Sequence, residues 1–333
     1  MKVFITGVAG FLGSHVAEAC HARGHEVTGV DNLLGSDVEN VPAGVTARVS
    51  DCNRPEEYAD LLEGVDVVYH CAAAPYEGLS VNSPRLVWEH TTMSAVSVAS
   101  AAISAGATRL VLCSSMARYG DQRAPFHETM EPRPVDPYGH AKVAAENVVR
   151  NLCDIHDVEW SIAVPHNIYG PRQRFVDPYR NVVGIMINRI LQGKPPIIYG
   201  DGSQRRCFSY IGDVVEPLLA LGERPEAVGE VINIGPDDDG VTINELAAVL
   251  LEKLDSTSVP LYFPARPQEV HAATCSADKA RKLLDYEPTW SLRDGLREQI
   301  AWVRALGPRP FVYHLPIEIE TPSTPRPWVD QLI

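Results

Sequence analysis

The 333-residue sequence has no apolar run that approaches the roughly 20 residues that a membrane-spanning helix needs. Its seven cysteines are odd in number and scattered, and no two stand in a Cys-x-x-Cys spacing. This argues against a zinc site or a redox pair and favours reduced, mostly buried thiols. Basic residues are also few, because 29 lysines and arginines stand against 43 aspartates and glutamates, a net charge of −14. We therefore expect a cytoplasmic protein with no metal, no nucleic-acid partner and no membrane partner, in which a few placed arginines bind any anionic ligand.

Short apolar runs alternate with helical patterns in the first half of the chain. Four runs are typical of buried parallel strands, at residues 2–6, 26–31, 65–70 and 109–114. Helical patterns near residues 13–23, 55–63 and 84–105 would cross over the sheet between them. The alternation predicts an α/β fold built on a Rossmann-type, doubly wound parallel sheet.

The pattern changes past about residue 163, where shorter elements are separated by proline-rich loops. We expect a Rossmann domain over residues 1–163 and a smaller α/β domain over residues 164–307, with some segments of the second returning to the first. Residues 308–333 hold six prolines and should form an extended tail on a surface of this chain or of a partner subunit.

A glycine-rich turn follows the first predicted strand and opens the first predicted helix. Gly7, Gly10 and Gly13 stand at a G-x-x-G-x-x-G spacing, in which glycine allows a tight turn, close approach of the backbone to a pyrophosphate and close helix packing. The helix N-terminus adds free N–H groups and the positive end of its dipole. Asp31 ends the second predicted strand, 24 residues after Gly7, where a carboxylate accepts hydrogen bonds from ribose hydroxyls and repels a 2′-phosphate. The predicted cofactor is therefore NAD and not NADP.

A phenol and an ammonium group are expected to lie together on another predicted helix. Tyr138 and Lys142 stand four residues apart, so they share one helix face. Ser115 follows the strand predicted at residues 109–114 and lies 23 residues before Tyr138. The arrangement predicts a proton-transfer site, and the alternative is an ordinary surface pair of Tyr138 and Lys142.

Together these motifs resemble the nucleotide-sugar branch of the extended short-chain dehydrogenase/reductase superfamily, from Met1 to about Trp302. The resemblance implies a catalytic trio of Ser115, Tyr138 and Lys142. It places Asp51, at the end of the third strand, against the adenine of NAD. Thr91 departs from the pattern, because relatives commonly carry asparagine there. The implied cofactor contacts are Gly7, Gly10, Phe11, Leu12, Gly13, Asp31, Asn32, Asp51, Cys52, Cys71, Ala72, Ala73, Thr91, Cys113, Tyr138 and Lys142.

The resemblance also implies a reaction. A free tyrosine has a pKa of about 10, so Tyr138 acts as a base at pH 7 only if its phenolate is stabilised by about 4 kcal/mol, which Lys142 and the cationic nicotinamide can share. Tyr138 then removes a hydroxyl proton from the sugar as a hydride leaves the same carbon, which gives a 4-keto sugar. Dehydrating relatives carry acidic residues where this chain has Met116 and Ala117, and decarboxylating relatives keep the glutamate. Epimerisation at carbon 4 is the simplest remaining outcome, so the expected enzyme is an isomerase.

Three loops resemble the substrate loops of nucleotide-sugar epimerases and should converge on the diphosphate of one UDP-sugar. The resemblance places Asn167 near the diphosphate, Arg206 and Arg266 on its phosphates, and Glu269 on the nucleotide ribose. The implied substrate contacts are Ser114, Ser115, Met116, Tyr138, Asn167, Arg174, Val182, Ile198, Tyr199, Arg206, Arg266 and Glu269.

Arg174 distinguishes between two sugars. In epimerases of UDP-glucuronate, the last arginine of Gly-Pro-Arg-Gln-Arg lies near the sugar carboxylate, which a planar guanidinium binds through both oxygens. The resemblance therefore favours UDP-glucuronate as the substrate. UDP-glucose/UDP-galactose interconversion stays open, because the UDP-glucuronate epimerases usually carry threonine where Asn167 stands and because Arg174 can instead pair with Asp177.

Two other classes of function also stay open. A dehydratase, which is a lyase, would need a thiol or a carboxylate such as Cys113 or Glu77. A non-catalytic dinucleotide sensor would keep the glycine-rich turn but has no need for Tyr138 and Lys142.

We also expect a homodimer, formed by the helices predicted near residues 84–105 and 138–156. Small residues in these helices allow close packing between helices. They are Ala99, Ala101, Ala102, Ala144 and Ala145.

Overall fold

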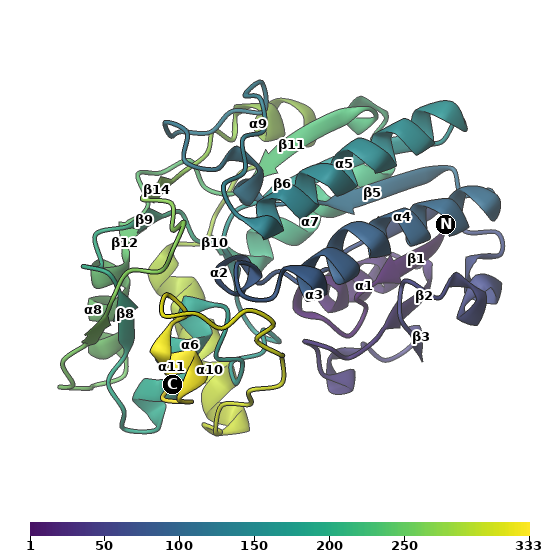
Figure 1. Ribbon diagram of the computed structural model, residues 1–333. Helices are drawn as coiled ribbons and strands as arrows, with labels where there is room; N and C mark the ends of the chain where they lie inside the picture. Colours follow the sequence, from purple (N-terminus) through teal and green to yellow (C-terminus); the bar gives the residue numbers. More distant parts are fainter.

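The central sheet has seven parallel strands in the order β11-β6-β5-β4-β1-β2-β3 (Figure 1). The computed structural model describes residues 1–333. The strands are β1 Lys2–Thr6, β2 Glu26–Asp31, β3 Thr46–Val49, β4 Val67–His70, β5 Arg109–Cys113, β6 Glu159–Pro165 and β11 Glu230–Ile234. The direction of the strand order reverses between β1 and β4. This is the predicted doubly wound sheet, and such a reversal leaves a crevice at the carboxyl ends of the strands, where ligands bind.

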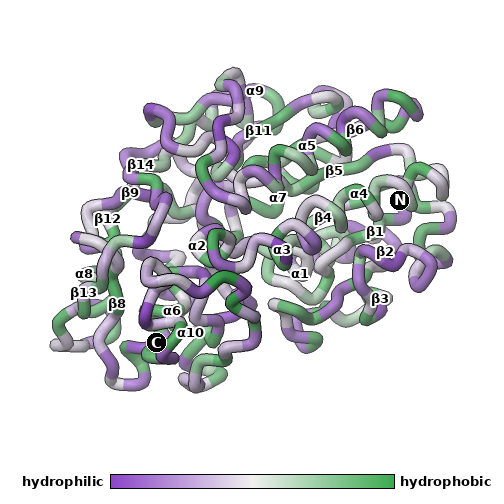
Figure 2. Tube along the Cα trace, in the orientation of Figure 1, coloured by the Kyte–Doolittle hydropathy of each residue, from purple (hydrophilic) through white to green (hydrophobic).

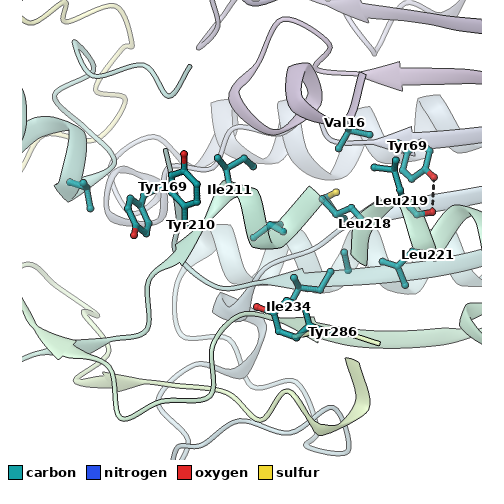
Figure 3. Packing of buried hydrophobic residues seen from close by; sticks show 14 of the residues in the cluster. Val16, Tyr69, Tyr169, Tyr210, Ile211, Leu218, Leu219, Leu221, Ile234 and Tyr286 are labelled. Carbon is teal, nitrogen blue, oxygen red and sulfur yellow. Dashed lines mark hydrogen bonds between the residues drawn. The ribbon is translucent and has the colours of Figure 1, made fainter. Parts of the chain in front are cut away.

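Helices cover both faces of this sheet. α1 (Phe11–Ala22) and α7 (Ile211–Glu223) pack on one face, and α4 (Ser94–Ser104) and α5 (Pro137–Ile155) pack on the other. Tyr69 of β4 ties α7 to the sheet, because its buried phenol donates a 3.0 Å hydrogen bond to the carbonyl of Leu219 (Figure 3). In Figure 2, hydrophilic and hydrophobic stretches alternate along α5, as expected for a helix with one buried face.

The crossover predicted as a helix at residues 55–63 is instead a pair of 3₁₀ turns, Pro55–Glu57 and Ala59–Leu62. Tyr58 separates the two turns. Its ring stacks on Phe4 in the core, and its phenol donates a 2.8 Å hydrogen bond to the carbonyl of Cys52. Tertiary packing of one aromatic side chain has therefore overridden the local helical pattern.

The helix predicted at residues 84–105 is also interrupted. It consists of α3 (Pro84–Trp88) and α4, joined by a π-helical turn at Glu89–Met93. The extra residue of this turn lets the adjacent Thr91 and Thr92 both face the interior. Their hydroxyls bond to neighbouring segments: that of Thr91 accepts from the Ala74 N–H, and that of Thr92 donates to the Ala141 carbonyl.

A second group of elements lies beside the carboxyl ends of the strands (Figure 1). Its longer helices are α6 Val182–Leu191, α8 Ile243–Lys253 and α10 Leu292–Leu306. Its short strands are β7 Ile168–Tyr169, β8 Ile197–Tyr199, β9 Arg205–Arg206, β10 Ser209–Tyr210, β12 Val241–Thr242, β13 Leu261–Phe263 and β14 Ala272–Ala273. The remaining short helices are α2 Glu77–Ser80, α9 Asp278–Leu284 and α11 Arg326–Val329.

The two groups of elements do not follow a single cut in the sequence. The boundary expected at residue 163 falls inside β6, because this strand continues to Pro165. α7 and β11 return to the sheet from the second half of the chain, and β11 pairs with β6 as the edge strand. Because α7 and β11 form one returning unit, the loop before α7 and the loop after β11 lie at the same end of the sheet.

The cysteine prediction is confirmed, because all seven thiols are free, six of them are buried and Cys71 is partly buried. The structure contains no helix that combines the length and the apolar character needed to cross a membrane.

Three of the five small residues named for the homodimer helices pack in the core of this chain. Ala99, Ala102 and Ala145 are fully buried in the core between α4, α5 and the sheet, whereas Ala101 and Ala144 are partly exposed. The homodimer stays a prediction, which light scattering of the purified protein would check.

Candidate active site

One large cavity, of about 440 Å³, lies at the carboxyl ends of the strands and is lined by both groups of elements. The predicted cofactor and substrate residues come together in its lining, with two exceptions. Thr91 and Arg174 are not part of the lining. The sequence motifs, which are spread from Gly7 to Glu269, therefore meet in one site.

The glycine-rich turn is shaped to admit a diphosphate. Gly7 adopts a positive φ of 69°, and a side chain on Gly13 would collide with the carbonyl oxygen of Gly7. Gly10 precedes α1, and no side chain caps the helix. The N–H groups of the first helical turn are therefore free to meet an anion, which is the arrangement a dinucleotide needs.

Asp31 is held in place at the end of β2. Its carboxylate accepts hydrogen bonds from the Ala9 N–H at 3.1 Å, the Leu33 N–H at 2.8 Å and the Ser36 hydroxyl at 2.6 Å. Farther along the same side of the cavity, Asn32 donates a 3.0 Å hydrogen bond to Asp51. These bonds orient two carboxylates toward the end of the cavity at which the adenosine of a dinucleotide is expected.

Thr91 lies behind the wall of the cavity. It is 1% exposed, and its hydroxyl accepts from the N–H of Ala74 at 3.3 Å. The side chain therefore supports the loop that follows β4, whose residues Cys71 and Ala72 do line the cavity.

The predicted catalytic trio is assembled by β5 and α5. Asp136 caps α5 by accepting from the Gly139 N–H at 2.9 Å, which places Tyr138 in the first helical turn and Lys142 one turn later. The ammonium of Lys142 lies 5.9 Å from the centre of the Tyr138 ring and donates a 2.7 Å hydrogen bond to the carbonyl of Cys113. Ser115 is the second residue after β5 and lies beside the Tyr138 phenol.

Burial sets the protonation of this trio. Burial lowers the pKa of Lys142 to about 8, so the ammonium keeps most of its charge at pH 7. Burial raises the pKa of the Tyr138 phenol, which the neighbouring Ser115 hydroxyl partly opposes. The phenol is therefore neutral in the protein alone, and it becomes a base only when further positive charge lies beside it.

Two carboxylates and an arginine outside the predicted contacts also line the site, and only Glu77 among them is named from the sequence, as a candidate for a dehydratase. Glu77 of α2 opens onto the cavity, and both Glu77 and Asp136 raise the pKa of Tyr138, whereas Arg180 opposes this effect. Burial, with the charge of Asp136, raises the pKa of Glu77. Only Asp136 had a local signal, because an aspartate before Pro137 is typical of a helix N-cap.

Arginines gather at another part of the same cavity. Arg266 lies over the ring of Tyr199 at 5.0 Å and pairs with Glu269 at 2.9 Å. Arg206 lies 3.9 Å from Glu269, and all four residues line the cavity. Two arginines that share one carboxylate keep positive charge free for a diphosphate.

Asn167 lies between these arginines and the catalytic trio. Its amide donates a 2.9 Å hydrogen bond to the carbonyl of Cys207, and it lies 3.3 Å from the Met116 sulfur. This amide therefore joins the end of β5 to the arginine-bearing loop.

Arg174 is placed differently from the prediction. It makes no hydrogen bond or ion pair, and its Nε is buried without a partner. The pairing with Asp177 that we considered belongs instead to Arg180, at 3.9 Å. Burial and the charge of Asp177 raise the pKa of the cavity residue Tyr76, whereas the charges of Arg180 and Arg174 lower it. Arg174 therefore lies close to Tyr76, behind the cavity wall.

The chain belongs to the NAD dependent epimerase/dehydratase family, because the model of this family matches residues 3–235. A UDP-glucose 4-epimerase from Thermotoga maritima, solved with UDP-glucose, is 30% identical, with 92% of this chain and 99% of that chain covered and a TM-score of 0.87. A UDP-glucuronic acid 4-epimerase from Bacillus cereus, solved with UDP-glucuronic acid and NAD, is 28% identical, with 92% and 100% covered and a TM-score of 0.86. A UDP-N-acetyl-alpha-D-glucosaminuronate decarboxylase from Bacillus cytotoxicus is 29% identical, with 92% and 98% covered. The nucleotide-sugar branch of the extended short-chain dehydrogenases/reductases and the cofactor NAD are thereby confirmed.

Proposed function

We propose that this protein is a UDP-sugar 4-epimerase, an isomerase that works through a transient 4-keto sugar. The observation that carries the proposal is the grouping of Ser115, Tyr138 and Lys142 in the same cavity as Arg206 and Arg266. A nucleotide diphosphate held by the arginines would present its sugar to the trio. The relatives that act at carbon 4 of UDP-sugars support the same function.

The reaction follows from the roles of these side chains. Tyr138 takes the proton from the hydroxyl at carbon 4, and Ser115 donates a hydrogen bond to the carbonyl oxygen that forms. Lys142 holds positive charge near the phenolate. NAD, which Gly7, Gly10 and Asp31 would hold, would supply the hydride acceptor and donor when bound. Tyr138 returns the proton once the keto sugar has turned its other face, so that substrate and product have the same composition.

Dehydration is the second candidate function. Met116 and Ala117 cannot transfer a proton, so the positions after Ser115 offer no acid for an elimination. Glu77 and Asp136 favour the alternative, because they bring two carboxylates into the cavity near Tyr138. The mass of the product separates the two functions.

The first prediction tests this function directly. Incubation with UDP-glucose and with UDP-glucuronate in the presence of NAD should give products of unchanged mass and no accumulation of NADH, because the hydride returns to the sugar. Chromatography with mass detection and the absorbance of NADH provide the measurement. Loss of one water would identify a dehydratase, loss of carbon dioxide a decarboxylase, and stoichiometric NADH a dehydrogenase.

For the sugar, we propose UDP-glucuronate. The supporting observation is that Arg174 lies close to the cavity wall with a guanidinium that has no carboxylate partner in the chain. A partly buried, unpaired guanidinium is stabilised when an anionic group binds to it. The carboxylate at carbon 6 of a uronate is such a group, and the relative solved with UDP-glucuronic acid supports this choice.

UDP-glucose is the competing sugar. Arg174 does not line the cavity, whereas the carboxylates of Glu77 and Asp136 do. A neutral hydroxymethyl group at carbon 6 faces no repulsion from those carboxylates. The relative solved with UDP-glucose supports this alternative.

The second prediction concerns the pH dependence. Replacing Lys142 with methionine removes a positive charge near the phenol, which raises the pKa of Tyr138. A charge about 6 Å away contributes about 3 kcal/mol at an effective dielectric constant of about 20, or about two pH units. The range over which kcat rises with pH should therefore move upward by about one to two pH units. Lys282→Met, on the exposed part of α9, is the control, and an unmoved profile in Lys142→Met would remove Lys142 from this role.

A further inference from the structure

Residues 308–333, which we call the strap, lie across the second group of elements and reach the Rossmann sheet layer. In Figure 1 the strap is the yellow segment that contains α11 and lies beside α6 and α10. The solved relatives described above match 92% of this chain, so the shared fold accounts for most of the chain but not for all of it.

Hydrogen bonds fix both ends of the strap to α6 and to the residue that follows it. The Asn188 side chain donates to the Arg309 carbonyl at 2.9 Å and accepts from the Arg309 N–H at 3.1 Å. Gln192 donates to the same carbonyl at 2.9 Å, and Arg189 donates to the carbonyl of Leu332 at 3.4 Å. Both ends of the strap are thus held against one helix of the second group of elements.

The middle of the strap is fixed to the Rossmann side. The two carboxylate oxygens of Glu318 accept from the N–H groups of Arg85 and Leu86, each at 2.9 Å. These are first-turn N–H groups of α3, which has no other side-chain cap, so Glu318 acts as the cap. Asn82 also donates to the Ile319 carbonyl at 2.9 Å. The strap therefore bridges the two sides of the cavity.

Trp328 of the strap enters the wall of the active site. It is 2% exposed, lines the cavity, and belongs to the same buried cluster as Tyr138. Its ring lies 5.7 Å from Tyr179 and 6.4 Å from Tyr199, the aromatic ring under Arg266. Two polar atoms of this aromatic group, Trp328 Nε1 and Tyr199 Oη, are buried without a hydrogen-bond partner. Unpartnered donors in a cavity wall are typical of a place where a ligand supplies the acceptor.

Trp328 and Arg266 both lie beside Gly78. A methyl group on Gly78 would lie 3.5 Å from the Trp328 ring and 2.9 Å from an Arg266 nitrogen. Trp328 thus borders the arginine that we assign to the diphosphate. Ile333 of the strap also lines the cavity.

We propose that the strap is part of the nucleotide-sugar site, with Trp328 as a positioning residue that holds Arg266 and Tyr199 against the diphosphate of the substrate. This rests on the proposed function only for the identity of the ligand as a nucleotide diphosphate. The strap completes the wall from within the same chain, and its anchor at Glu318 keeps Trp328 in place while the ligand is bound.

The test compares Trp328→Ala and Trp328→Phe with the wild type, using UDP as the probe in calorimetry and a UDP-sugar in turnover. Trp328→Ala should weaken UDP binding and raise KM about tenfold, a change of about 1.4 kcal/mol, with kcat changed less than about threefold. Trp328→Phe should recover most of the loss, because it keeps an aromatic ring in the wall. NAD binding should stay unchanged, since Tyr179, Tyr199 and Gly78, the neighbours of Trp328 described above, are not among the residues assigned to the cofactor. UDP affinity within about twofold of the wild type in Trp328→Ala would overturn the proposal, and so would a parallel loss of NAD, which indicates general unfolding.

A second pair of variants tests the anchor. Glu318→Ala should expose the strap to limited proteolysis and weaken UDP binding severalfold, and saturating UDP should restore protection in the variant. Glu320→Ala is the matched control, because Glu320 is an exposed acid of the same strap that makes no hydrogen bond or ion pair. Equal proteolysis of the two variants would contradict the role of Glu318. UDP binding does not depend on turnover. A protein that binds UDP through the strap but leaves UDP-sugars unchanged would therefore refute the proposed epimerase function and support the proposed role of the strap.

Discussion

Replacing Tyr138 with phenylalanine is expected to lower kcat by about 10²- to 10⁴-fold while UDP-sugar affinity stays within a few-fold of the wild type. The phenol lies beside Ser115 with the Lys142 ammonium nearby, and phenylalanine keeps the ring in the same buried place. Only the hydroxyl is lost, and this is the group that accepts and returns the proton. Ground-state binding depends mainly on the distant arginines Arg206 and Arg266, which the substitution leaves in place.

Turnover and calorimetric binding of the same UDP-sugar, measured on the same preparation, separate these two effects. Tyr262→Phe is the matched control, because Tyr262 is 55% exposed on β13 and does not line the cavity. Activity of Tyr138→Phe close to that of the control would remove Tyr138 from the mechanism. A loss of binding as large as the loss of kcat would instead give the phenol a structural role.

Replacing Arg174 with alanine is expected to lower turnover of UDP-glucuronate by roughly 10- to 150-fold, because a partly desolvated bond between guanidinium and carboxylate is worth about 1.5 to 3 kcal/mol. Turnover of UDP-glucose should change little, since its hydroxymethyl group has no charge to lose. A held carboxylate also cannot turn easily into the geometry in which the β-keto acid intermediate loses carbon dioxide. The variant should therefore release some UDP-pentose.

Wild type and variant are given both sugars, and the products are resolved by chromatography with mass detection. Arg123→Ala serves as the control, because Arg123 is exposed and makes no hydrogen bond or ion pair. Equal efficiency of the wild type on the two sugars, or an undiminished uronate rate in Arg174→Ala, would leave UDP-glucose as the substrate. This outcome would also agree with the absence of Arg174 from the cavity lining.

The parts of the site that the sequence predicted are those with a local physical cause. The turn at Gly7, Gly10 and Gly13 needs residues without side chains, and the spacing of these glycines in the sequence shows this requirement directly. Tyr138 and Lys142 share a helix face because four residues make about one helical turn. The alternation of apolar runs and helical patterns likewise determined the doubly wound sheet, which in turn brings strand ends to one edge.

Other features depended on contacts between distant segments. Tyr58 broke a predicted helix because its ring packs on Phe4, and Glu77 reaches the cavity because α2 lies against the start of α5. Arg174 follows the expected motif, yet the surrounding wall keeps it out of the lining, and Arg180 takes the expected partner.

The sequence by itself determined the fold class and the cofactor and predicted that Tyr138 and Lys142 lie together, because periodicity, backbone conformation and helix spacing act over a few residues. Only the tertiary structure decided which charged side chains line the cavity and that residues 308–333 contribute to its wall. Six prolines predict an extended segment but carry no information about where it lies. The position of Trp328 beside Arg266 is decided by hydrogen bonds and burial between residues more than 100 positions apart, such as those of Asn188 with Arg309 and of Glu318 with Leu86.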